Sequence, residues 1–415
     1  MKVALVHDYL NEFGGAERVL LVLSEIWPKA PIYTAFYKEG SSAYERFKDK
    51  KIITSWAHKI PFFASHLHSP LRFLAPLIWH SFDFSDYDLV ITSSSWYVTK
   101  GVVRGHQVIR LSGNRELKPD SLKTRKPDRP VEICYCHTPP RYLYGYQTAV
   151  EWQKYWPVKV YALIVNHFMR VYDFEAAQRV DYFIANSKEV ESRIKKFYRR
   201  DSVVIYPPVD LPIPASPTGN TSDGGRLSLR SRDSSEVGKL AKKDYFLVVS
   251  RIVKGKGLQL AVEAANVFGF KLKVVGKPAG YSHEYQKIKS IARENVEFLG
   301  FVSDEELVRL YSGARAYLAL AQDEDFGITP VEAMLCGTPV IAYDGGGYRE
   351  TIIQQKTGLF FDPATLGSLT LAINTFLDME KKGQFDRNYI RRHAQKFSKE
   401  RFKREIKKFV EAKLK

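Results

Sequence analysis

Short apolar runs alternate with helical patterns through both halves of the chain, and this alternation restricts the fold more than any other feature. Residues 258–268, for example, are apolar at every third or fourth position, which gives a helix one face to bury. Continuous apolar runs predict strands buried on both faces, as in parallel sheets that helices cover on both sides. The chain is therefore predicted to be α/β, with strands at 3–6, 89–92, 131–135, 182–185, 203–205, 246–250, 272–275, 296–299, 316–319, 340–342 and 359–361.

The length of 415 residues suits two domains of roughly 200 residues each. Residues 211–244 are rich in Pro, Ser, Gly, Arg and Lys and poor in apolar residues, which is typical of a flexible segment. Residues 113–130 form a second charged segment, predicted to be a solvated loop. We expect an N-terminal domain at 1–205, a linker with a flexible insertion at 206–244, a C-terminal domain at 245–395 and an amphipathic helix at 396–415. The apolar side of this last helix is predicted to pack on a domain rather than to contact a membrane.

Composition limits the partners. The chain has 63 Lys and Arg against 46 Asp and Glu, a net charge of +17, which favours anionic partners such as nucleotide phosphates or anionic lipid. Its cations are spread along the chain without a known nucleic-acid-binding motif, so no nucleic-acid partner is expected. The three cysteines do not predict a disulfide framework, and Cys134 and Cys136 lack a second pair at zinc-finger spacing. We expect no signal peptide, no membrane-spanning segment and a cytoplasmic protein.

Two glutamates separated by seven residues form the strongest local pattern. Glu324 follows the predicted strand 316–319, and Glu332 lies about one turn into a helix that begins near Ile328. Both carboxylates would then lie at one edge of the sheet, where they could accept hydrogen bonds from the hydroxyls of a sugar and a ribose. The N-terminus of the helix beside them suits a diphosphate. An ordinary acidic helix start is the alternative interpretation.

Together with Phe326-Gly327, the Cys-Gly-Thr-Pro-Val-Ile run at 336–341 and the three glycines at 345–347, this segment resembles the retaining family-4 glycosyltransferases of the GT-B fold. The resemblance extends to 250–258, 295–302, the Phe-Gly-Gly-Ala-Glu-Arg run at 13–18 and the segment around His137. The motif His-Asp-Tyr at 7–9 is similar to the corresponding motif of the mannosyltransferase-like branch of this family. The resemblance implies two facing Rossmann-like domains with an interdomain cleft.

The resemblance also implies roles for individual residues. Arg251 and Lys256 would hold the donor diphosphate, with Lys254 as a third cation, and His137 would contact the donor sugar. Glu324 would position the sugar and Glu332 the ribose. The implied catalytic residues are His137, Arg251, Lys256 and Glu324, and the implied donor-binding residues are Gly14, Gly15, Lys254, Val302, Phe326, Gly327, Ile328, Thr329 and Glu332.

The implied reaction transfers a sugar, mannose from GDP-mannose, to a glycan or lipid-linked acceptor with retained configuration and without a metal or cofactor. The alternatives are a protein that only binds nucleotide sugars and a phosphorylase-like enzyme with another donor. Residues 56–84 combine aromatic and basic side chains, and they fit an aromatic-rich core as well as a peripheral contact with the inner face of the membrane.

Overall fold

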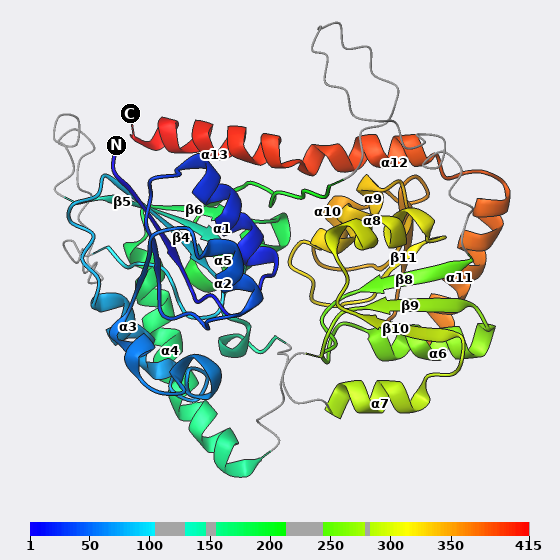
Figure 1. Ribbon diagram of the computed structural model, residues 1–415, viewed down its shortest axis with the longest axis horizontal. Helices are drawn as coiled ribbons and strands as arrows, with labels where there is room; N and C mark the ends of the chain where they lie inside the picture. Colours follow the sequence, from blue (N-terminus) through cyan, green and yellow to red (C-terminus); the bar gives the residue numbers. More distant parts are fainter. Residues whose placement is uncertain (104–128, 147–154, 213–243, 279–282, 415) are drawn as a thin grey trace, which may run out of the picture. The chain divides into compact units, whose positions relative to one another are not determined.

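The computed structural model describes residues 1–103, 129–146, 155–212, 244–278 and 283–414, which form two compact units (Figure 1). One unit comprises Met1–Pro208 together with Lys399–Lys415, and the other comprises Val209–Ser398. Each contains one parallel sheet with helices on it, so the predicted α/β class is confirmed. The predicted loop at 113–130 and the predicted insertion at 211–244 lie almost wholly outside the described residues.

The sheet of the N-terminal unit has seven parallel strands in the order β3-β2-β1-β4-β5-β6-β7. The sequence analysis missed β2 and β3, which have three residues each. The order reverses between β1 and β4, where His7 and Ser93 are register partners. The strands are β1 (Val3–His7), β2 (Ile32–Thr34), β3 (Ile52–Thr54), β4 (Leu89–Ser94), β5 (Val131–Cys136), β6 (Tyr182–Ala185) and β7 (Ser202–Val204).

Alternate residues of β1 and β4 serve two separate cores, one on each face of this sheet. Val3 and Leu5 of β1 belong to one core, and Ala4 and Val6 belong to the other. Helices α1 and α13 cover the first face, and α3, α4 and short helical turns cover the second. The helices of this unit are α1 (Gly15–Ile26), α2 (Ser42–Phe47), η1 (Trp56–Lys59), η2 (Phe63–Leu67), η3 (Arg72–Leu74), α3 (Ala75–His80), η5 (Arg141–Leu143), α4 (Trp156–Arg179), α5 (Lys188–Tyr198) and α13 (Lys399–Leu414).

Helix α13 completes the core of the N-terminal unit, although it follows the whole C-terminal unit in the chain. Phe402, Ile406 and Val410 are buried among the side chains of α1 and the first strands, which confirms the predicted packing. Lys403 adds an ion pair of 2.6 Å with Glu25 of α1. Of the predicted terminal helix at 396–415, residues 399–415 belong to the N-terminal unit and 396–398 to the C-terminal unit.

The aromatic segment 56–84 has a divided environment. Phe63, Trp79, Phe82 and Phe84 are buried in the core of the N-terminal unit, as its interpretation as a core segment predicts. Other members of the segment, including Phe62, are exposed. No helix in the described part of the chain is both long and apolar enough to cross a bilayer.

The C-terminal unit has six parallel strands in the order β10-β9-β8-β11-β12-β13, and the order reverses between β8 and β11. Apolar side chains of these strands form one core with those of α6 and α11. The strands are β8 (Tyr245–Val249), β9 (Lys271–Val275), β10 (Val296–Gly300), β11 (Tyr317–Ala319), β12 (Val340–Tyr343) and β13 (Gly358–Phe361). The helices are α6 (Leu258–Phe268), α7 (His283–Ile291), α8 (Asp304–Gly313), α9 (Ile328–Leu335), α10 (Tyr348–Thr351), α11 (Leu366–Lys381), α12 (Arg387–Ala394) and η8 (Gln395–Phe397).

Candidate functional site

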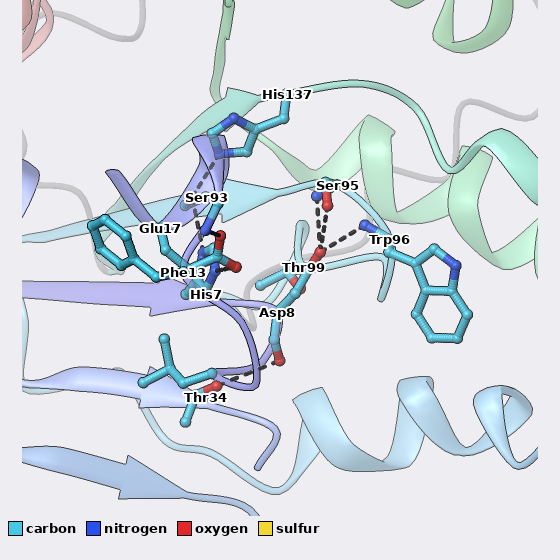
Figure 2. A network of polar contacts seen from close by, with 12 residues as sticks. His7, Asp8, Phe13, Glu17, Thr34, Ser93, Ser95, Trp96, Thr99 and His137 are labelled. Atoms are coloured by element: carbon cyan, nitrogen blue, oxygen red, sulfur yellow. Dashed lines mark hydrogen bonds and ion pairs between the residues drawn. The ribbon is translucent and has the colours of Figure 1, made fainter. Parts of the chain in front are cut away.

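A chain of polar contacts crosses the point in the N-terminal sheet where the strand order reverses (Figure 2). The Ser93 hydroxyl at the end of β4 lies 3.0 Å from His7 Nδ1 and 2.8 Å from His137 Nε2. His7 is the last residue of β1, and His137 directly follows β5. Ligands of open α/β sheets bind at the carboxyl ends of the strands, near such a reversal, and these three residues lie there.

The same chain of contacts continues to the glycine loop. His7 Nε2 lies 3.2 Å from Glu17 Oε1, and Glu17 Oε2 accepts a hydrogen bond of 2.8 Å from the Gly14 backbone N–H. Gly14 and Gly15 are exposed at the start of α1, where Glu17 caps the helix. The structure therefore joins the predicted residues Gly14 and His137 through three residues to which the sequence analysis gave no role: His7, Glu17 and Ser93.

Burial makes His137 a neutral hydrogen-bonding group. Desolvation, helped by the nearby His7 and opposed by Asp8, lowers the pKa of His137 to about 3. A neutral imidazole has one donor and one acceptor nitrogen. One of these nitrogens lies against Ser93, and the other determines what the ring can offer to a ligand.

Asp8 holds the end of β4 in place and so indirectly positions Ser93. Its carboxylate is buried and accepts hydrogen bonds from the Ser95 N–H (3.1 Å), the Ser95 hydroxyl (2.9 Å) and the Trp96 N–H (2.6 Å), as Figure 2 shows. The Thr99 hydroxyl donates to the other carboxylate oxygen. A carboxylate with four donors is well satisfied and fixes the loop that supplies them.

In the C-terminal unit, an ion pair crosses the corresponding reversal of strand order. Lys256 Nζ lies 2.6 Å from Glu324 Oε2, and both side chains keep part of their surface exposed. Lys256 lies in the loop between β8 and α6, and Glu324 lies in the loop between β11 and α9. Two of the four predicted catalytic residues thus meet at the carboxyl edge of this sheet.

Glycines allow the loop after β12 to approach the backbone of Glu324. The Gly347 N–H donates a hydrogen bond of 2.9 Å to the Glu324 carbonyl. Gly346 has a φ of 53°, and a Cβ at this position would lie 2.3 Å from the same carbonyl oxygen. Only glycine fits this contact without a shift of the backbone.

Glu332 lies inside α9 and is only 1% exposed. The Tyr311 hydroxyl donates a hydrogen bond of 2.9 Å to Glu332 Oε2. In the same helix, Thr329 Oγ1 lies 2.8 Å from the Tyr317 hydroxyl, which in turn donates to the Val249 carbonyl at 3.0 Å. Contact between Glu332 and a ribose stays a prediction.

The other predicted residues of the C-terminal unit lie in the loops after β8 and β10 and at the start of α9. Arg251 and Lys254 are exposed in the loop after β8, and Val302 is half-buried after β10. Gly327 is the residue before α9, with a φ of 86°, and half-buried Ile328 begins that helix. Phe326 is buried, with its ring 5.5 Å from that of Phe397.

The cysteines have no exposed thiol. Cys134, Cys136 and Cys336 are free and buried. Desolvation raises the pKa of Cys134 and that of Cys336 to about 12, which keeps both as thiols near neutral pH. They are therefore poor candidates for a nucleophile.

Part of the chain is similar to known glycosyltransferases. Residues 230–397 match the family model described as glycosyl transferases group 1. The chain is 27% identical over 234 residues to the D-inositol 3-phosphate glycosyltransferase of Mycobacteroides abscessus, a match that covers 54% of this chain and 50% of that protein. It is 24% identical over 274 residues to the alpha-1,3/1,6-mannosyltransferase ALG2 of Dictyostelium discoideum, a match that covers 59% of this chain and 61% of that protein. The chain thus spans about half to three-fifths of these relatives.

The fold likeness extends over the full length. The crystal structure of Anabaena HepE in complex with UDP-glucose superposes with a TM-score of 0.68 at 17% identity, covering 99% of this chain and all of that one. A likeness at this identity concerns the fold alone. Together with the two parallel sheets, this likeness shows that the chain has the GT-B fold, and its residues 230–397 are similar to the group 1 glycosyl transferases.

Proposed function

We propose that the protein is a retaining glycosyltransferase that moves a hexose from a nucleoside diphosphate sugar to an acceptor hydroxyl. The observation that carries this proposal is the Lys256–Glu324 pair at the strand-order reversal of the C-terminal sheet. An ammonium group at this edge can bind a diphosphate, and a carboxylate beside it can accept hydrogen bonds from sugar hydroxyls. Glu324 would hold Lys256 in position until the diphosphate takes over as its partner.

In the proposed reaction, the bond between the sugar C1 and the diphosphate oxygen breaks while the acceptor oxygen bonds to C1 on the same face. The acceptor proton passes to an oxygen of the leaving diphosphate. The negative charge that develops there would be stabilised by Arg251, Lys256 and the N-terminus of α9. This scheme assigns no metal, cofactor or protein nucleophile.

The donor we propose first is GDP-mannose. The resemblance of the His-Asp-Tyr motif at 7–9 to mannosyltransferases implies this donor, and the name of the ALG2 relative supports it. UDP-glucose is the second candidate, because the structural neighbour HepE binds it. The proposed acceptor is a glycan or a lipid-linked sugar.

The first test measures release of free sugar from a panel of nucleotide sugars, in the presence of EDTA, by the wild-type chain and by Glu324→Gln and Lys256→Gln. We expect turnover of one donor, lowered about 100-fold in each variant, because each removes a charge that acts on the transition state. Glu297→Gln is the matched control, since it breaks a 2.8 Å ion pair with Lys273 between neighbouring strands of the same sheet. This control should retain full turnover.

Several outcomes would contradict the proposal. Binding of a nucleotide sugar without turnover, even with candidate acceptors present, would indicate a binding protein. Release of sugar phosphate that depends on inorganic phosphate would indicate a phosphorylase-like enzyme. Activity abolished by EDTA and restored by a divalent cation would contradict metal independence, and inversion at C1, seen by NMR of the product, would contradict retention.

A further inference from the structure

Helix α4 is apolar on two opposite sides. Its inner side, which includes Ala162, Met169 and Ala176, packs into the N-terminal unit. Its outer side carries large apolar residues that are 48% to 76% exposed; these define the α4 face and are Trp156, Val160, Leu163, Ile164, Phe168 and Val171. They follow one another at steps of three or four residues, apart from the adjacent pair Leu163 and Ile164, which places them on one side of the helix. A helix that is apolar all round is normally covered.

The segment 62–80, which lies beside α4, also exposes large apolar side chains. Arg72 Nη2 of η3 donates a hydrogen bond of 2.9 Å to the Asn166 side chain of α4, and the rings of His80 in α3 and Tyr172 in α4 lie 6.3 Å apart. The segment 72–80 therefore lies beside α4 (Figure 1). Phe62, Phe73 and Leu77 of this neighbouring segment are exposed as well, Phe62 to 74%.

Most of α4 and the segment beside it lie in long stretches of sequence that contain no acidic residue. The sequence has no Asp or Glu in 50–82 or in 152–172, although 46 of the 415 residues are acidic. The exposed cationic side chains include Lys59, Lys159 and Arg170. Such side chains can place their charge in a headgroup layer while their stems lie against apolar surface.

The geometry points to an anionic lipid surface as the occupant of the α4 face. Exposed Trp156 and Phe168 would enter the boundary between headgroups and acyl chains, and the cations would meet anionic headgroups. A second copy of the chain fits less well. In a two-fold dimer the same patch faces itself, which would bring Lys159 and Arg170 against like charges with no acidic partner in this stretch. The inference rests on the surface of the N-terminal unit and does not depend on the proposed function.

The test is flotation of the full chain with vesicles of phosphatidylcholine alone and of phosphatidylcholine mixed with phosphatidylglycerol in equal amounts. We expect the wild-type chain to float with the mixed vesicles and to bind less as salt increases. The double variant Leu163→Ser with Phe168→Ser should bind at least about tenfold more weakly, because it removes two side chains that would be buried in lipid. Lys159→Gln should weaken binding about fivefold.

The matched control is Val267→Ser with Leu371→Ser, which removes two apolar side chains of similar exposure, 63% and 68%, from the C-terminal unit. It should float like the wild-type chain. Circular dichroism and donor hydrolysis in solution should be unchanged in both double variants, which separates a failure of lipid binding from a failure of the proposed function. Brominated lipid should quench the fluorescence of Trp156, measured as the difference between wild type and Trp156→Tyr. This second readout reports contact with lipid directly and does not rely on a variant that binds more weakly.

Three results would overturn the inference. One is a wild-type chain that binds neither kind of vesicle. Another is equal flotation of the Leu163→Ser, Phe168→Ser variant and the wild type. The third is a concentration-dependent dimer that the same variant abolishes, without vesicle binding, which would assign the α4 face to a second copy.

Discussion

Ser93 connects the two histidines of the N-terminal network, since its hydroxyl can donate to one imidazole and accept from the other. Ser93→Ala would leave two buried ring nitrogens without this partner. We expect the free energy of unfolding in urea to fall by about 1–3 kcal/mol. We also expect kcat for donor hydrolysis to fall more than KM changes, because the His137 ring would lose the contact that orients it.

Ser24→Ala provides the comparison for this prediction. Ser24 is also buried, but its hydroxyl donates to the Leu21 carbonyl within α1, at 2.7 Å, and contacts neither histidine. If both variants lower kcat alike, Ser93 has no positioning role beyond its contribution to stability.

At the scale of secondary-structure elements, the loop after β12 determines where the Glu324 loop lies. Gly346→Ala would add strain at a positive φ and push against the Glu324 carbonyl. We expect turnover to fall at least about tenfold and the unfolding free energy to fall by about 1–3 kcal/mol. Gly383→Ala separates the two causes, because Gly383 has a φ of 68° and no atom within 4 Å of an added Cβ. This variant should lose stability only, and equal turnover in both would show that the contact with Glu324 does not matter.

Elements with a local signal could be predicted from sequence, whereas contacts across the chain could not. Helix α6 was predicted with its observed bounds, since its apolar period is a local signal. Strands β2 and β3 were missed, although β7 and β11, which also have three residues each, were predicted, so length alone does not explain the difference. The same distinction applies to the site: Glu324 lies in a local motif, but Ser93 and His7 are 86 residues apart and meet only through the pairing of β4 with β1.

At the scale of the whole molecule, buried histidines make stability depend on pH. His137 has a folded-state pKa of about 3 against an ordinary value of 6.5. Below pH 6.5 the unfolded chain therefore binds a proton at this position that the folded chain does not, and folding becomes less favourable as pH falls towards 3. Through this one group, the free energy of unfolding falls by up to about 1.4 kcal/mol for each pH unit of acidification in this window, and it does not change with pH well above 6.5.

Urea unfolding of wild type and His137→Gln between pH 7 and pH 5 checks this expectation. The variant should lose less stability on acidification than the wild type does. His167→Gln, at an exposed position on α4, serves as the reference and should keep the wild-type dependence. An identical pH dependence in all three proteins would show that His137 is not held neutral by the fold.

The position of α13 also has a consequence for synthesis on the ribosome. Phe402, Ile406 and Val410 fill the core of the N-terminal unit, yet they emerge only after all of the C-terminal unit has been made. The first unit to leave the ribosome is therefore the last to close its core, which reverses the usual order in which domains fold as they are synthesised. Until then the apolar side chains of α1 lack their cover, and a nascent chain at this stage is a natural client for chaperones.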